Sequence, residues 1–195
     1  MQKTDYGINL IIFLITLIIV LSLFREDGKW TTAKSRIVFR YFTIQSNVFC
    51  AFSSLLLCIF PASRIVWILK YIGTAAVSVT LLTVLVFLGP KMGYKLLLTG
   101  IDFFMHLLTP LLAIISFSFL ERRGMSFCIS LTGMLPVILY GFLYLSKILL
   151  APEGKKWDDF YGFNQGGKWP AAFLLMTAGT FCVCTVLRFL QNTGI

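Results

Sequence analysis

The sequence predicts an all-α polytopic integral membrane protein, a bundle of six transmembrane helices that forms a single domain over residues 1–195. Of its residues, 58% are hydrophobic and only 13% are charged, whereas roughly 25% of the residues of soluble domains are charged. Six apolar stretches reach the roughly 17–25 residues that a helix needs to cross the bilayer. The polar breaks between most of them are short, which is typical of a compact helical bundle.

The six stretches follow one another with ordinary boundary signals. The first ends in the polar segment 25–28 without the small-residue cleavage site of a signal peptide, so we expect it to remain as a span. Pro110 is expected to kink the fourth span, and Pro170 to lie in the first turn of the sixth. Short segments rich in Pro, Gly or charged residues are expected to end spans two, three and four, at 61–64, 89–93 and 121–124. The predicted spans are 7–24, 38–60, 66–88, 97–120, 126–150 and 170–190.

The distribution of positive charge indicates an orientation. With six spans, the connections after the first, third and fifth share one face, and both termini share the other. Eleven of the seventeen lysines and arginines fall on the first face and six, Lys70 among them, on the second. The positive-inside rule therefore places the first face in the cytoplasm. The only long connection, 151–169, belongs to that face, whereas Gln2–Asp5 carries no signal that we can interpret.

Composition also excludes several kinds of site. Because the cations behind the net charge of +9 lie mostly in loops and at span ends, we expect lipid head groups as partners, and no nucleic acid. The five cysteines lie in apolar runs, which argues against a disulfide framework. With one histidine in the chain, neither a metal site nor a cofactor is predicted.

Polar side chains concentrate just inside the second apolar stretch. Thr43, Gln45, Ser46 and Asn47 fall within five residues, and each unpaired polar group in hydrocarbon costs free energy. They are therefore predicted to find partners in the protein interior or in trapped water. Thr43 and Asn47 are four residues apart and share one face of a helix.

The predicted partners lie in the fourth stretch, at Asp102 and His106, which are also spaced i, i+4. Spans two and four begin on the same face, and Thr43 and the Asp102–His106 pair lie a similar number of residues inside them. At about 1.5 Å per residue, both groups are expected roughly 7–14 Å below the same surface. The topology therefore predicts that the two groups can meet.

These residue types suit nucleophilic catalysis. A threonine hydroxyl needs an adjacent base, and histidine is the side chain whose ordinary pKa lies nearest neutrality. Thr43 and His106 would form a nucleophile–base pair, with Asp102 either orienting the imidazole or pairing with a cation near the surface. Back-bonding of Thr43 to its own helix and structural pairing of Asp102 with His106 are the alternatives. Donors for a developing oxyanion would come from Asn47, Gln45 and Ser46, or from free backbone N–H groups if the helix begins near Thr43.

The long connection contributes candidates for a substrate rim. It carries aromatic, acidic and amide side chains on the face that holds the polar residues, so it could cover the mouth of a cavity. The same residues would equally form an interfacial aromatic belt with solvated charges. The rim candidates are Trp157, Asp158, Tyr161 and Asn164.

Two motifs resemble those of the androgen-induced gene 1 family. They are Tyr41-Phe42-Thr43-Ile44-Gln45-Ser46-Asn47 and the segment from Asp102 to Pro110, in which His106 stands four residues before the proline. The resemblance implies a multi-span intramembrane hydrolase that cleaves fatty acid esters of hydroxy fatty acids without metal or cofactor. It also implies that Thr43 is the nucleophile and His106 the base, in a bacterial relative located in the cell membrane. The segment 157–170 does not clearly reproduce the late motifs of the animal members. Asp102 is a candidate from spacing alone.

Three functions therefore compete. The first is an intramembrane lipid esterase that uses Thr43 and His106 on a lipid substrate from the bilayer. The second is a small transporter or channel with an Asp102–His106 relay, which requires water access from both faces. The third is a structural membrane protein without turnover, in which the polar residues join helices.

Overall fold

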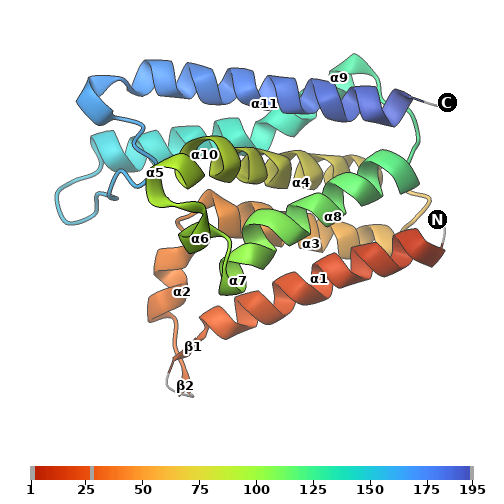
Figure 1. Cartoon of the computed structure of the whole chain (residues 1–195), viewed down its shortest axis with the longest axis horizontal. Helices are drawn as coiled ribbons and strands as arrows, with labels where there is room; N and C mark the ends of the chain where they lie inside the picture. Colours follow the sequence, from red (N-terminus) through yellow and green to blue (C-terminus); the bar gives the residue numbers. More distant parts are fainter. Residues whose placement is uncertain (1–2, 27–28, 194–195) are drawn as a thin grey trace.

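The computed structural model describes residues 3–26 and 29–193. Within them, six helical segments are long and apolar enough to cross a membrane, so the predicted all-α bundle of six spans is confirmed. The observed spans are Thr4–Leu23, Phe42–Ile59, Arg64–Met92, Gly100–Leu120, Phe127–Leu150 and Trp169–Asn192. Both termini lie at one end of the bundle, and the connections after spans one, three and five lie at the opposite end (Figure 1).

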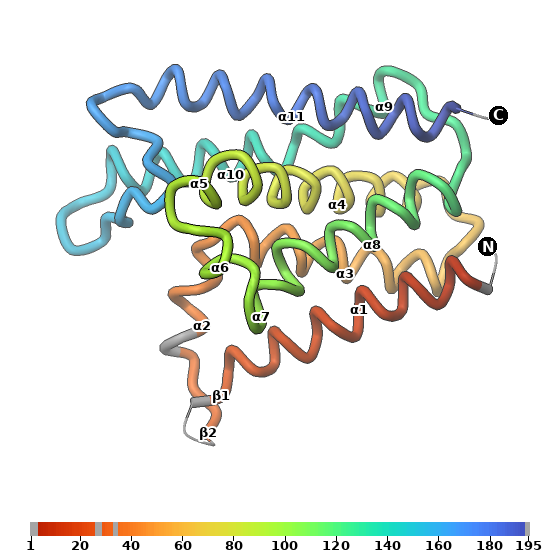
Figure 2. The backbone as a smooth tube through the Cα atoms, in the orientation of Figure 1, coloured from red at the N-terminus to blue at the C-terminus, as the bar shows by residue number. Residues whose placement is uncertain are grey.

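Helix α4 (Arg64–Thr83) is the centre of the packing. Helix α3 (Phe42–Ile59) packs between α4 and α1 (Lys3–Leu23), and α11 (Trp169–Asn192) covers α4 from the other side (Figure 2). Most of α4 is buried, and its small residues, such as Gly73 and Ala75, allow neighbouring helices to approach it closely. The fourth and fifth spans complete the bundle; they comprise α7 (Gly100–Phe103), η2 (Phe104–Leu108), α8 (Thr109–Ile115) and η3 (Ser116–Leu120), then α9 (Phe127–Leu131), η4 (Thr132–Met134), α10 (Leu135–Leu145) and η5 (Ser146–Leu150).

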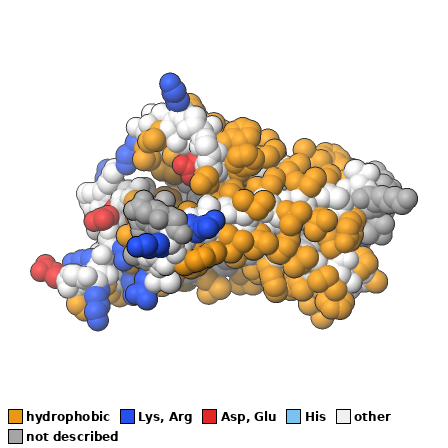
Figure 3. Space-filling model, turned by 90° about the horizontal axis from the view of Figure 1, so that it is seen from below, with side chains coloured by type: hydrophobic (Ala, Val, Ile, Leu, Met, Phe, Trp, Pro, Cys, Tyr) orange, Lys and Arg blue, Asp and Glu red, His pale blue; other side chains and the backbone are white. Residues whose placement is uncertain are grey.

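The surface divides into an apolar flank and a charged end. In Figure 3 the hydrophobic side chains cover the flank of the helices, and the charged side chains gather at one end. That end holds the short antiparallel pair β1 (Arg25–Glu26) and β2 (Lys29–Trp30), α2 (Ala33–Val38) and α6 (Tyr94–Leu97). Large apolar side chains exposed on the flank, such as Ile18 and Leu139, each 66% exposed, suit hydrocarbon as the surrounding solvent.

Two spans start a few residues later than predicted. The second span starts at Phe42 rather than at residue 38, because Tyr41 is extended (φ −83°, ψ 135°) and separates it from α2. The fourth starts at Gly100 rather than 97, because Thr99 is extended (φ −124°, ψ 154°). The first shift matters for function, since it places Thr43 in the first turn of α3.

The prolines inside the third and fourth spans follow π-helical turns. Pro90 follows η1 (Val84–Leu88), and the helix then continues as α5 (Gly89–Met92), so the third span ends within the expected segment 89–93 but four residues beyond the predicted end at residue 88. The third span ends at Gly93, whose φ of +91° favours glycine. Pro110 follows η2, where the amide of Thr109 bonds to the carbonyl of Phe104 five residues back. Proline has no N–H to give to the residue four before it, and the wider turn accommodates this loss.

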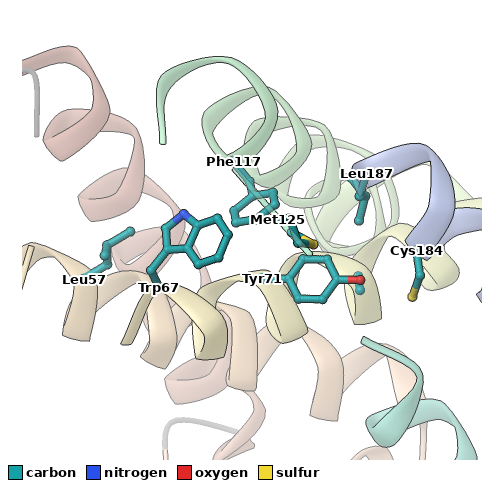
Figure 4. Close-up of a cluster of buried hydrophobic side chains, with 8 residues drawn as sticks. Leu57, Trp67, Tyr71, Phe117, Met125, Cys184 and Leu187 are labelled. Carbon is teal, nitrogen blue, oxygen red and sulfur yellow. The ribbon is translucent and has the colours of Figure 1, made fainter. Parts of the chain in front are cut away.

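An aromatic core lies toward the end of the bundle that holds the termini. Trp67 and Tyr71 of α4 pack against Phe117, with ring centroids 5.3 and 5.5 Å apart, and all three are fully buried (Figure 4). The polar atoms of the first two rings are bonded: Trp67 Nε1 donates to the Glu121 carbonyl, and Tyr71 Oη to that of Ser130. The core therefore joins α4 to the fourth and fifth spans.

Candidate functional site

A cavity of about 230 Å³ lies near the charged end, between α3, α4 with η1, α10 and α11. Its wall is mostly apolar, and part of it consists of side chains exposed on the flank, such as Phe87 and Leu175. The cavity therefore opens toward the surface that faces hydrocarbon. Its lining residues are Phe42, Thr43, Val79, Thr80, Leu82, Thr83, Val84, Phe87, Leu88, Val137, Tyr140, Tyr161, Gly162, Phe163, Ala172, Leu175, Met176, Gly179 and Thr180.

Thr43 lines this cavity from the first turn of α3. The first hydrogen bond of that helix runs from the amide of Gln45 to the carbonyl of Tyr41. The amides of Phe42, Thr43 and Ile44 come before it and therefore have no acceptor within the helix. The Phe42 amide donates to Tyr161 Oη over 3.1 Å. Within the described residues, the amides of Thr43 and Ile44 have no acceptor. Free N–H groups beside a hydroxyl are what an oxyanion hole requires.

Tyr161 connects the long loop to this helix start. Besides accepting from Phe42, its phenol interacts with the Thr43 side chain and packs beside Tyr140. Burial raises the pKa of Tyr161 to about 12, although the Phe42 amide favours the charged form and opposes the shift. The phenol is therefore neutral over the physiological range, and it acts as a hydrogen-bonding group rather than a base.

The three predicted oxyanion donors beside Thr43 are engaged elsewhere. Gln45 Nε2 donates to the Phe39 carbonyl, and Ser46 Oγ bonds to the Thr43 carbonyl and to Thr80 Oγ1. Asn47 Nδ2 donates to the carbonyls of Thr43 and Met105, over 2.8 and 3.0 Å. None of these three residues lines the cavity. They hold α3 against neighbouring segments, and the backbone amides are the better placed donors.

His106 is buried in the π-helical turn η2. Its Nδ1 lies 2.8 Å from the carbonyl oxygen of Leu97. Because a carbonyl only accepts, Nδ1 carries the hydrogen, and in the neutral ring Nε2 keeps its lone pair. This is the tautomer that a general base needs.

The backbone segments that carry Thr43 and His106 are neighbours in the fold. Through Asn47, the carbonyl oxygens of Thr43 and Met105 lie no more than about 6 Å apart. In the part of the chain that the structure describes, no hydrogen bond joins the Thr43 hydroxyl to the imidazole, and His106 does not line the cavity. The predicted meeting of the two segments is therefore seen in their backbones, and proton transfer would need a further side-chain movement or a bridging water.

Asp102 does not support His106 in this structure. Its side chain is exposed in α7, and the Leu97 carbonyl occupies the position at Nδ1 that a supporting carboxylate would take. The i, i+4 argument assumed a regular α-helix, but the π-helical turn that starts at Phe104 changes the angle between these positions.

Of the four predicted rim residues, only Tyr161 lines the cavity. Trp157 and Asn164 are half-buried beside it, and Asp158 is exposed. The loop, which includes the short 3₁₀ turn η6 (Gln165–Gly167), is organised by one carboxylate. Asp159 accepts from Tyr144 Oη and from the amides of Phe163 and Asn164.

Sequence reasoning also missed a buried polar cluster at the opposite end of the bundle. Asp5 and Asn9 of α1, Lys70 of α4, and Ser116 and Glu121 of the fourth span are all buried there. Asp5 and Asn9 are spaced i, i+4, and Lys70 lies inside an apolar run. Those two signals were available, but the three segments are far apart in sequence.

Comparison with known proteins gives no relative. No protein-family model, curated protein or solved structure matches this chain. The resemblance to the androgen-induced gene 1 family stays a prediction from two motifs. Among the described residues, no group of three or more His, Cys, Asp or Glu side chains is placed to hold a metal ion.

Proposed function

We propose that this protein is an intramembrane lipid esterase with Thr43 as its nucleophile, in a bacterial cell membrane. The observation that carries the proposal is the position of Thr43, in the wall of a mostly apolar cavity that opens toward the hydrocarbon-facing surface. An acyl chain entering laterally would lie against apolar side chains, with its ester group beside the first turn of α3.

The chemistry follows that of other acyl transfers. The Thr43 hydroxyl attacks the ester carbonyl, and its proton passes to Nε2 of His106, directly or through one water. The oxyanion accepts hydrogen bonds from the free amides of Thr43 and Ile44, at the positive end of the α3 dipole. The alkoxide leaves with the proton, and water releases the fatty acid from the acyl-threonine.

The two alternatives have less support. An Asp102–His106 relay needs contact between the two side chains, whereas Asp102 is exposed and His106 Nδ1 is bonded to Leu97. A purely structural role accounts for Gln45, Ser46 and Asn47, whose side chains join backbone segments. It does not account for a cavity that places a hydroxyl beside two free amides.

Fluorophosphonate labelling of the purified protein in detergent tests the proposal. We expect the wild type to be labelled, Thr43→Ala to lose all labelling, and His106→Ala to react about 10²–10⁴-fold more slowly. Thr177→Ala is the matched control, because Thr177 bonds to its own helix at the Phe173 carbonyl and lies outside the cavity. Equal labelling of wild type and Thr43→Ala would refute the nucleophile assignment.

A further inference from the structure

The buried polar cluster lies at the end of the bundle opposite the cavity. Asp5 and Asn9 belong to the first turns of α1, Ser116 and Glu121 to the end of the fourth span, and Lys70 to α4. Asn9 and Lys70 are fully buried, and Asp5 and Glu121 are 1% and 5% exposed. The proposed esterase chemistry uses none of them.

The two carboxylates converge on one amide and one hydroxyl. Asn9 Nδ2 donates to Asp5 Oδ1 over 2.9 Å and to Glu121 Oε1 over 2.7 Å. Ser116 Oγ donates to Glu121 Oε1 and lies 3.5 Å from Asp5 Oδ1. Four side chains, from the first span and from the end of the fourth, therefore meet in one hydrogen-bonded cluster.

Lys70 is the cation of this region. Its ammonium donates to Ser54 Oγ over 2.8 Å and acts electrostatically on Asp5. When all three groups are ionised, two carboxylates and one ammonium leave a net charge of −1 in the interior. Burying a net charge costs free energy, so one further positive charge is needed to make the cluster neutral.

Two acceptor atoms show where that charge belongs. Among the described residues, Asn9 Oδ1 and Glu121 Oε2 are buried and have no hydrogen-bond partner. Both belong to side chains whose other polar atom binds within the cluster. An oxygen of a buried carboxylate cannot rotate to satisfy itself, so these atoms require a donor or a cation.

We propose that Asp5, Asn9, Ser116 and Glu121 form a binding site for a single positive charge, supplied as a proton or as a sodium ion. Carboxylate, amide and hydroxyl oxygens are hard ligands that suit either occupant. With Lys70 charged, one bound positive charge neutralises the interior and provides the partner that the unpaired oxygens lack. The site is separate from the Thr43 cavity, so an experiment that refutes one proposal leaves the other unaffected.

Among the described residues, the other charged and titratable groups near the cluster leave this count unchanged. The Arg122 guanidinium, next in sequence to Glu121, turns away to the carbonyls of Ser118 and Thr193. The thiols of Cys50 and Cys58 lie in the same electrostatic environment and are neutral when protonated. Lys70 is therefore the balancing charge to vary in an experiment.

The test is the unfolding equilibrium of the full chain in detergent, in sodium chloride or choline chloride of equal ionic strength, between pH 5 and 9. If a proton is the ligand, the folded state holds one proton more than the unfolded state. The unfolding constant then rises up to tenfold per pH unit as pH rises, whatever the salt. If sodium is the ligand, a tenfold increase in sodium concentration at high pH lowers the unfolding constant up to tenfold, and choline has no effect.

Three variants examine the charge count. Asp5→Asn and Glu121→Gln each neutralise the site and should abolish the dependence of the unfolding constant on pH or sodium. Lys70→Met leaves two negative charges, so the unfolding constant should change up to hundredfold for each pH unit or each tenfold change in sodium concentration. Glu153→Gln, at an exposed carboxylate of the long loop, should respond as the wild type does. A wild type indifferent to both pH and sodium would overturn the proposal, even if no variant folds. An unchanged response in Asp5→Asn would also overturn it.

Discussion

Replacing Gly73 by alanine should loosen the contact between α3 and α4 that positions the Thr43 cavity. A Cβ atom at this position would lie 2.8 Å from Cys50 Cα, 2.9 Å from Ser53 Oγ and 3.3 Å from Cys50 N. Carbon atoms in contact are normally about 3.5–4.0 Å apart, so α3 would have to move by roughly 0.7–1.2 Å. Two of the three contacts are with backbone atoms, which cannot rotate away.

The magnitude follows from a comparison with an open glycine. Overpacking of this kind costs about 1–3 kcal/mol, while the intrinsic helix preference of alanine over glycine returns about 0.5–1 kcal/mol. At Gly179, in the middle of α11, an added Cβ would meet nothing within 4 Å. Gly179→Ala therefore keeps the favourable helix preference of alanine without the clash. The free energies of unfolding of the two variants should differ by about 1–3 kcal/mol.

The assay is reversible unfolding in mixed micelles, followed by far-ultraviolet circular dichroism. Gly73→Ala should unfold at lower denaturant than the wild type, and Gly179→Ala at the same or higher denaturant. Equal stability of the two variants would show that the α3–α4 contact is not tightly packed at Gly73.

Two further changes probe the cavity end. Tyr161→Phe removes the acceptor of the Phe42 amide and should cost about 1 kcal/mol, while Tyr41→Phe should cost nothing. Because burial raises the pKa of Tyr161 to about 12, the contribution of Tyr161 to stability is complete below the ordinary tyrosine pKa of about 10 and is lost as pH rises through 12. A difference between the ultraviolet titrations of the wild type and Tyr161→Phe that is centred near pH 10 would contradict this. Asn47→Ala releases α3 from η2 and should cost about 1–3 kcal/mol in the same unfolding assay, whereas Asn164→Ala should stay within about 0.5 kcal/mol.

Helix number and order follow from the sequence because hydrocarbon imposes one simple rule, that every spanning segment is long, apolar and hydrogen-bonded to itself. The site follows only in part. The depth of Thr43 and His106 is a matter of counting residues, and their segments do lie together through Asn47. The role of Asp102 depends on helix geometry at a π-helical turn, and that of Tyr161 on the path of a loop. Neither leaves a periodic signal.

The sequence also overstates what polar side chains inside a span indicate. Gln45, Ser46 and Asn47 form one group in the sequence, yet each donates to a backbone carbonyl, and only Asn47 Oδ1 among their side-chain polar atoms is buried without a partner in the described residues. What distinguishes a functional group is an atom left without a partner. Unpaired hydroxyls such as those of Thr74 and Thr109 are weak indicators, because a helical threonine can rotate toward its own backbone.

Backbone amides at a helix start and the second oxygen of a buried carboxylate have no such alternative. Among the described residues, the amides beside Thr43 and the unpaired oxygens of Asn9 and Glu121 are groups of this kind. They need opposite kinds of ligand, since free N–H groups stabilise negative charge and free oxygens stabilise positive charge. Because α4 runs from the cluster to the cavity, Lys70 and Thr80 lie on one helix. If a cation bound at the cluster shifts this helix, the rate of Thr43 labelling should differ with and without sodium at constant pH.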